Sequence, residues 1–163
     1  MQPFFNPSKL NRLLRFKPTL GQLMDLCEEN YRLLLKLSPE LHQMQGHYHS
    51  TKTANVDLHL EILEQSRYTT LLRLTYLFAD GQQPDPDTTL RVYHDSRQLE
   101  IIDLKQKRLF GKHSYQHPAL FMKWRANVFI NKWLSYCIKQ QHSFNESCDN
   151  DQCLENRAIA MPS

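Results

Sequence analysis

The alternation of apolar and polar residues between positions 56 and 78 predicts two long β-strands. Apolar side chains occupy the even positions of residues 56–62, and the even positions take up the pattern again over residues 68–78. A period of two is typical of a strand with one buried face. The polar residues 64–67 lie between the two runs and predict the turn of an antiparallel hairpin. We therefore expect the centre of a sheet here, with its core side chains at even positions.

Two further strands follow the loop of residues 79–87, which is rich in Pro, Gly and Asp. They cover residues 90–95 and 98–104, and the Asp95–Ser96 pair has the composition of a tight turn. Leu99 and Ile101 are the expected inward positions of the last strand. Residues 46–50 are compatible with one more short strand inside the loop that ends near residue 54.

Amphipathic helices are predicted on both sides of the strands. From residue 20 to about residue 37 the apolar positions follow i, i+3, i+4 spacing, with Thr19 as N-cap. Pro39 ends this helix, because the residue before a proline is disfavoured in the helical region. The second helix runs from Pro118, a favoured first-turn residue, to about Lys139.

This order of helix, four antiparallel strands and helix predicts an α+β fold, a two-layer sandwich with both helices covering one face of the sheet. The opposite face would carry Glu61, Arg73, Arg91 and Glu100, whose cross-strand charge pairs contribute about 0.2–1 kcal/mol each. We expect a basic N-terminal arm (1–17), a single domain (18–140) and a flexible acidic tail (141–163).

Composition indicates an ordinary globular protein. The chain has 163 residues, of which 40% are hydrophobic and 23% charged. It has no signal-peptide core and no apolar stretch of about 20 residues, so we expect no membrane association. The four cysteines form no disulfide or metal framework, which favours the reducing cytoplasm. The chain has only four glycines, which argues against Gly-rich phosphate loops. We expect no cofactor.

The net charge of +3 is unevenly distributed. A basic loop at residues 105–117 combines aromatic side chains with the cations Lys105, Lys107, Arg108 and Lys112. Cations between aromatic rings are typical of single-stranded nucleic-acid binding, although no RNA-binding motif accompanies them. A solvated loop is the alternative interpretation.

One group of residues has the composition of a ligand site. The candidates are Arg67 and Tyr68 at the central turn, and Arg91, Tyr93, His94 and Asp95 on the next strand. A histidine oriented by a carboxylate can act as a base, and an arginine can bind a carboxylate or phosphate. The alternative is that Asp95 starts a turn while His94 ends a strand, because adjacent strand residues point to opposite faces.

Histidines and cysteines suggest two weaker sites. His47, His49 and His59 would share one face if they lie on strands, and three imidazoles can hold zinc. Loop histidines are the simpler interpretation, and we expect no metal. Cys148 and Cys153 lie in the acidic tail, where they could form a redox pair or half of a metal knuckle. Two unreactive thiols are the simpler interpretation.

Four segments together resemble the YqiB-like proteins, a family of small bacterial cytosolic proteins of unknown function. These segments are MDLCEENY (24–31), EQSRYTTL (64–71), LRVYHD (90–95) and NVFINKWLSYC (127–137). The resemblance covers about residues 18–140 and implies no activity, cofactor or catalytic residue.

Three functional hypotheses follow. The leading one is a non-enzymatic binding or adaptor domain that presents the outer sheet face and the basic loop to an unknown protein or anionic ligand. The second is single-stranded nucleic-acid binding through the basic loop. The third is a small enzyme or binding protein that holds an anionic metabolite through Arg67, Arg91 and His94.

Overall fold

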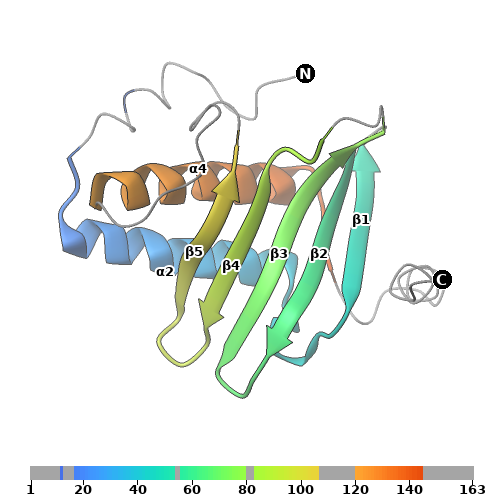
Figure 1. Cartoon of the computed structure of the whole chain (residues 1–163), viewed down its shortest axis with the longest axis horizontal. Helices are drawn as coiled ribbons and strands as arrows, with labels where there is room; N and C mark the ends of the chain where they lie inside the picture. The colour runs from blue at the N-terminus through green and yellow to red at the C-terminus, as the bar shows by residue number, and fades with distance from the viewer. Residues whose placement is uncertain (1–11, 13–16, 54–55, 80–82, 107–119, 145–163) are drawn as a thin grey trace.

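A computed structural model describes residue 12 and residues 17–53, 56–79, 83–106 and 120–144. Its helices and strands in chain order are α2 (Leu20–Leu37), a short 3-10 turn η1 (Leu41–Gln43), β1 (His47–Thr53), β2 (Val56–Gln65), β3 (Thr69–Phe78), β4 (Asp87–Tyr93), β5 (Gln98–Lys105) and α4 (Leu120–Lys139). Figure 1 shows both helices on the same side of the sheet, which confirms the predicted α+β two-layer architecture.

The sheet is antiparallel and its strands follow the chain order β1-β2-β3-β4-β5. The prediction of four strands was wrong by one, because β1 is a full strand. This strand carries no clear hydrophobic period, and its inward positions are Tyr48 and Ser50. Pairing with Leu60 and Leu58 of β2 specifies it instead, so the tertiary context overrides the weak local signal.

The core lies between the sheet and the helices. Even positions of the two central strands are buried as predicted, with Leu58, Leu60, Leu72 and Leu74 fully inaccessible to solvent. Leu99 and Ile101 also face the core. Tyr68 departs from the pattern, since it lies in the hairpin turn and keeps 52% of its surface exposed.

Helix α2 begins and ends where the sequence predicts. The Thr19 hydroxyl accepts the backbone N–H of Gln22, and the Gln22 side chain accepts the backbone N–H of Thr19, which completes a capping box. The helix ends at Leu37, and Ser38 is the C-cap. The expected start of α4 at Pro118 lies outside the described residues.

The two helices lie side by side and run in the same direction (Figure 1). A polar contact is buried between them. The Asn30 Nδ2 donates to the backbone oxygen of Asn127 at 3.0 Å and to its Oδ1 at 3.2 Å, while the Cys27 thiol lies 3.6 Å from that Oδ1. These bonds fix the register of α2 against α4.

The chain continues in contact with the core after α4. His142 and Phe144 are both buried, and the backbone N–H of Phe144 donates to the oxygen of Leu37 at 2.7 Å. His142 lies within hydrogen-bond distance of Tyr76 on β3 and Ser50 on β1. These contacts attach β1 to the rest of the sheet. The proposed tail boundary at residue 141 stays a prediction.

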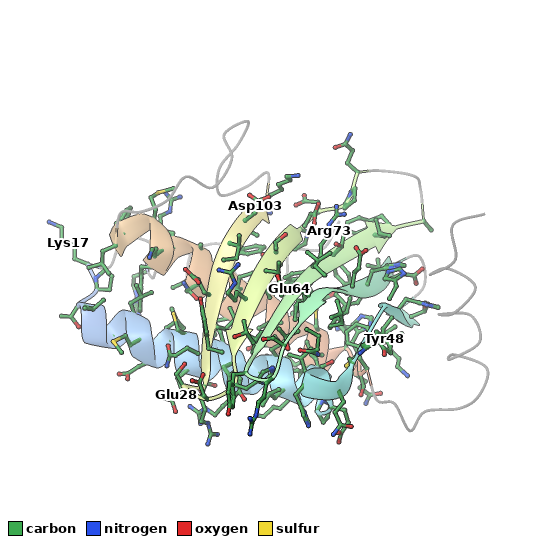
Figure 2. All side chains as sticks on the ribbon, turned by 60° about the horizontal axis from the view of Figure 1, so that its bottom comes forward. Lys17, Glu28, Tyr48, Glu64, Arg73 and Asp103 are labelled. Carbon is green, nitrogen blue, oxygen red and sulfur yellow. The ribbon has the colours of Figure 1, made fainter. Side chains whose placement is uncertain are left out.

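The outer face of the sheet, opposite the helices, is polar. It carries Glu61, Arg73, Arg91 and Glu100, as predicted from the sequence. Glu61 faces Arg73 and Arg91 faces Glu100 across adjacent strands. Arg73 forms a bidentate ion pair with Asp87, at 2.8 and 2.7 Å. Figure 2 labels Arg73 on β3 together with Glu64 on β2 and Asp103 on β5. Carboxylates outnumber cations among the described residues of this face: Asp57, Glu61, Glu64, Asp87, Glu100 and Asp103 against Arg73, Arg91 and Lys105.

None of the helices in the described ranges combines the length and apolar character needed to cross a lipid bilayer.

Candidate functional site

The β2–β3 and β4–β5 hairpins lie side by side at one end of the sheet. Thr69 pairs with Tyr93, and the backbone N–H of His94 donates to the oxygen of Tyr68 at 2.8 Å. Antiparallel pairing of consecutive strands requires this proximity, because alternate hairpins fall on the same edge. The two sequence segments that carried the predicted site therefore meet.

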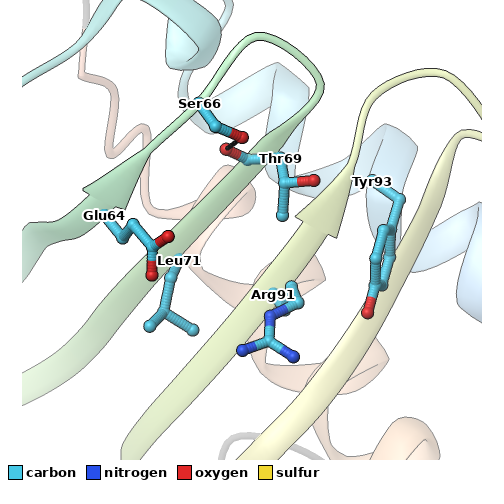
Figure 3. Close-up of a pocket in the computed structure, with 6 residues that line it drawn as sticks. All are labelled: Glu64, Ser66, Thr69, Leu71, Arg91 and Tyr93. Atoms are coloured by element: carbon cyan, nitrogen blue, oxygen red, sulfur yellow. Dashed lines mark hydrogen bonds between the residues drawn. The ribbon is translucent and has the colours of Figure 1, made fainter.

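A cleft of about 310 Å³ opens on the outer face next to these hairpins. Its lining comes from β2, the β2–β3 turn, β3 and β4, as Figure 3 shows. The lining residues are Glu64, Ser66, Thr69, Leu71, Arg91 and Tyr93. The volume is at the lower end of the range for ligand pockets, about 300–1,000 Å³. The cleft therefore suits one small molecule or one side chain of a partner.

Arg91 is the cation of the cleft. It forms no ion pair with a carboxylate of the described residues, although Glu100 is its cross-strand neighbour. The Glu100 carboxylate instead accepts the Tyr93 hydroxyl at 2.8 Å. This hydrogen bond, together with burial, raises the pKa of Tyr93, while a hydrogen bond from Arg91 and its charge act in the opposite direction. A guanidinium has five N–H donors, so Arg91 keeps others for an anionic group from outside.

Glu64 is the anion of the cleft and lies on the far side of it from Arg91. Leu71 is the cross-strand neighbour of both residues, so Glu64, Leu71 and Arg91 form one row across β2, β3 and β4. With strands about 4.8 Å apart, the Cα atoms of Glu64 and Arg91 are separated by about 10 Å. An apolar side chain thus stands between two opposite charges.

A β-bulge places Glu64 on this face. The register shifts between Ile62 and Glu64, which leaves Leu63 with 47% of its surface exposed. An extra residue changes which face each following side chain takes. Glu64 therefore faces outward although it occupies an even position, and Gln65 faces inward.

The other candidates at the hairpins lie outside the cleft. Arg67 and Tyr68 are exposed at the tip of the β2–β3 hairpin, with the guanidinium carbon of Arg67 5.1 Å from the Tyr68 ring centroid. Asp95 is exposed in the β4–β5 turn, where its Oδ1 accepts the backbone N–H of Ser96 at 2.9 Å. Asp95 therefore closes the turn and does not orient His94 through a hydrogen bond in this structure.

His94 points toward the helices, away from Arg91. Its Nε2 lies 2.8 Å from the Thr70 hydroxyl, and its ring packs edge-on against Tyr31 and His42. Burial lowers the pKa of His94, the charge of His42 lowers it further, and Asp95 acts in the opposite direction.

The bonding of Gln65 decides which way the protons point in this network. Its Nε2 donates to the backbone oxygens of Leu41 at 2.7 Å and Met44 at 3.1 Å, so its Oε1 is the acceptor for the Thr70 hydroxyl. The Thr70 oxygen can then act toward His94 only as a hydrogen-bond acceptor. His94 must donate from Nε2 and is not positioned to remove the Thr70 proton. The network joins η1 to the ends of β2, β3 and β4.

Three histidines lie together on the outer face where β1 pairs with β2. His47, His49 and His59 are on β1 and β2, so the interpretation as loop histidines was wrong. His59 Nδ1 and His47 Nε2 are 3.1 Å apart, and the His59 ring stacks on both others. Burial and the two neighbouring imidazoles lower the pKa of His59 to about 4.

In the ranges that the structure covers, no group of three His, Cys, Asp or Glu residues is arranged to hold a metal ion. Lys105 ends β5 and is exposed. The remaining cations of the basic loop, Lys107, Arg108 and Lys112, lie outside the described residues, as do Cys148 and Cys153. The arrangement of these predicted sites stays untested.

Four lining residues of the cleft were not among the candidates predicted from the sequence: Glu64, Ser66, Thr69 and Leu71. The sequence pattern assigns residues 64–67 to a polar turn. The predicted hairpin could have identified Thr69 and Leu71 as neighbours of Arg91 and Tyr93, because the position of the turn fixes which face of the sheet their side chains take. The bulge that turns Glu64 outward leaves no comparable pattern in the sequence.

The chain is similar to known proteins whose descriptions assign no activity. A family model described as "Protein of unknown function (DUF1249)" matches residues 33–143. The chain is 32% identical over 129 residues to "Uncharacterized protein YqiB" of Escherichia coli strain K12, and the match covers 76% of this chain and 91% of that protein. The protein of the same description from Escherichia coli O157:H7 gives the same values.

No solved structure matches the chain.

Proposed function

Since the chain belongs to the DUF1249 family of proteins of unknown function, we propose from its geometry that it is a non-enzymatic binding domain. In this proposal the outer sheet face receives a partner, and the cleft binds one anionic group of that partner at Arg91. The observation that carries the proposal is the Arg91 guanidinium, which lines a cleft and lacks an ion-pair partner among the described residues.

The chemistry of arginine supports an anionic partner group. A guanidinium offers planar donors that match a carboxylate or phosphate, and a charge-assisted hydrogen bond is about twice as strong as a neutral one. Arg73 on the same face is already satisfied by Asp87. Arg91 is therefore the better candidate for recognition.

A binding role fits the side chains around Arg91 better than catalysis. Among the described residues that line the cleft there is no histidine, and Tyr93 is the one whose hydroxyl is bonded to a carboxylate. Its pKa is raised, so at neutral pH it stays protonated. His94, the base considered from the sequence, faces the helices.

The anionic group can come from a free small molecule or from an acidic side chain of a protein. Nuclear magnetic resonance titration with acetate and with inorganic phosphate tests the first source, using the backbone amide signals of Thr69 and Arg91. Pulldown from lysate with wild-type and variant protein tests the second. We expect saturable shifts with a small anion, and no binding to either source would refute the proposal.

Arg91→Gln is the decisive variant. Loss of a charged hydrogen bond of about 1.5–3 kcal/mol should weaken anion binding about 10–100-fold. The matched control is Arg97→Gln, which removes an exposed arginine from the β4–β5 turn at the same end of the sheet. Equal weakening by both substitutions would indicate a diffuse charge effect and would contradict a specific role of Arg91.

The charges on this face support nucleic acid less than a small anion or a protein as the partner, because carboxylates outnumber cations there. The loop cations Lys107, Arg108 and Lys112 remain a separate proposal. Fluorescence anisotropy with single-stranded RNA, before and after their replacement by glutamine, checks it. Binding with a steep salt dependence that the substitutions abolish would favour the nucleic-acid alternative.

We further propose that the protein works in the cytoplasm. The cysteines on the described helices, Cys27 and Cys137, are free thiols, which supports a reducing compartment. Fractionation of cells that express the tagged protein checks this location.

A further inference from the structure

The cleft holds two opposite charges apart instead of pairing them. Glu64 and Arg91 face outward from β2 and β4, and Leu71 of β3 lies between them in the same cross-strand row (Figure 3). Elsewhere on this face an arginine does pair with a carboxylate, as Arg73 on β3 pairs with Asp87 on β4. Glu64 and Arg91 are two strands apart, and no ion pair joins them in the described part of the chain.

This separation has a chemical consequence. Two unpaired charges beside an apolar surface remain hydrated when the cleft is empty, and a ligand that pairs both can replace that water with two charge-assisted hydrogen bonds. A ligand with only a negative charge would satisfy Arg91 and leave Glu64 without a partner. A partly desolvated, unpaired carboxylate opposes such binding.

The floor and wall of the cleft are apolar between the two charges. Leu71 is half-buried beneath them, and the Tyr93 side chain stands on the Arg91 side. The Tyr93 hydroxyl is occupied by Glu100, which leaves its ring to contact a ligand. A short hydrocarbon segment would cover these surfaces.

We infer that the cleft binds a small zwitterion, with a carboxylate at Arg91, an ammonium group at Glu64 and an apolar segment over Leu71. The inference rests on the proposed function, because it names the class of ligand for the same site. The cleft volume of about 310 Å³ accommodates a molecule of amino-acid size. The Cα separation of about 10 Å between Glu64 and Arg91 favours charges separated by several bonds.

The experiment compares matched probes with one or two charged ends. Glycine, γ-aminobutyrate and ε-aminohexanoate vary the distance between the charges, while butyrate and butylamine each lack one of them. Binding is followed by the methyl signals of Leu71 and the side-chain N–H signal of Arg91 in the full-length protein. The Leu71 methyl groups report contact with the hydrocarbon segment directly.

We expect γ-aminobutyrate to bind at least about tenfold more tightly than butyrate, as an added charge-assisted hydrogen bond implies. Glycine should bind more weakly than γ-aminobutyrate, because it cannot span the Leu71 side chain. Glu64→Gln should abolish the advantage of γ-aminobutyrate over butyrate without weakening butyrate binding. Arg91→Gln should weaken both ligands.

The control is Glu28→Gln, which removes an exposed carboxylate from α2 and should leave both affinities unchanged. Thermal unfolding of each variant verifies that the fold is retained. If butyrate binds wild-type protein as tightly as γ-aminobutyrate, the zwitterion inference is wrong and the proposed anion site stands. If no probe with a carboxylate shifts the cleft signals, the inference is wrong, and the proposed function is wrong as well if neither inorganic phosphate nor a protein partner binds through Arg91.

Discussion

Tyr93 and His94 are adjacent in the chain, but their side chains lie on opposite sides of the sheet. The Tyr93 hydroxyl donates to Glu100 on the outer face, whereas the His94 imidazole contacts Thr70, Tyr31 and His42 near the helices. The arginine and the histidine that an enzymatic hypothesis would combine are thereby separated by the sheet itself. The outer cleft and the inner hydrogen-bond network should respond to different substitutions.

The tautomer of His94 is the first test of this network. Because Gln65 directs the Thr70 hydroxyl proton toward itself, His94 should carry its proton on Nε2 at neutral pH. Long-range nitrogen–proton correlation spectra of the imidazole distinguish the two tautomers. A proton on Nδ1 would overturn the assigned direction and would make His94 a candidate base again.

His94→Ala should lower the free energy of unfolding by about 1 kcal/mol, the usual net value of one hydrogen bond. His94→Gln can place an N–H near the position of Nε2 and should recover part of that loss. Urea denaturation measures both variants. Anion binding at Arg91 should be unchanged in either, and a loss of binding there would show that the two networks are coupled.

The histidine cluster on β1 and β2 predicts that stability falls in acid. The pKa of His59 is about 4 in the folded chain against an ordinary value of 6.5. Between these values the unfolded chain binds more protons, so the free energy of unfolding should decrease as the pH falls from about 7 to about 4. The His59→Ala variant should show a shallower dependence, measured by urea denaturation at several pH values.

His47 and His49 must be included in that measurement, since their imidazoles contact His59 and the pKa of His47 is also lowered by burial. Asp57 acts on His59 in the opposite direction. A His59 imidazole that titrates near 6.5 in the folded protein would contradict the prediction.

The Arg73–Asp87 pair predicts a second contribution to stability. Burial tends to raise the pKa of Asp87, but the hydrogen bond and charge of Arg73 outweigh burial and lower it. Arg73→Gln leaves the largely buried Asp87 without its main partner and should destabilise the fold by about 1–2 kcal/mol. The expected destabilisation is moderate because 44% of the Arg73 side-chain surface is exposed, and solvent weakens an exposed ion pair.

A double-mutant cycle with Asp87→Asn isolates the pair. The depressed pKa of Asp87 means that this contribution is present at neutral pH and is lost as the pH falls through the folded-state value. Additive effects of the two substitutions would show that the ion pair contributes no coupling energy.

Cysteine reactivity tests the packing of the helices. Burial raises the pKa of Cys27 to about 11, and burial also raises the pKa of Cys137. Both thiols should therefore be almost entirely protonated at pH 8 and react slowly with iodoacetamide. The measurement uses a Cys148→Ser, Cys153→Ser background and mass spectrometry. Rapid labelling of Cys137 in the native protein would contradict the packing of α4 against the sheet.

The amino-acid pattern determined the elements and their buried faces. The alternation in β2 and β3, the i, i+3, i+4 spacing of α2 and the signals at Thr19 and Pro39 act between neighbouring residues, so the sequence alone reveals them. The shared outer face of Glu61, Arg73, Arg91 and Glu100 also followed, because alternate residues of a strand point to the same side of the sheet.

Only the tertiary structure decided the composition of the cleft. A period of two assigns Glu64 to the core face, and the bulge after Ile62 reverses that assignment and brings the carboxylate into line with Leu71 and Arg91. Strand β1 likewise depends on pairing with β2. The bulge and the weakly apolar strand β1 depend on contacts between distant segments of the chain. The local pattern of apolar and polar residues therefore does not predict them.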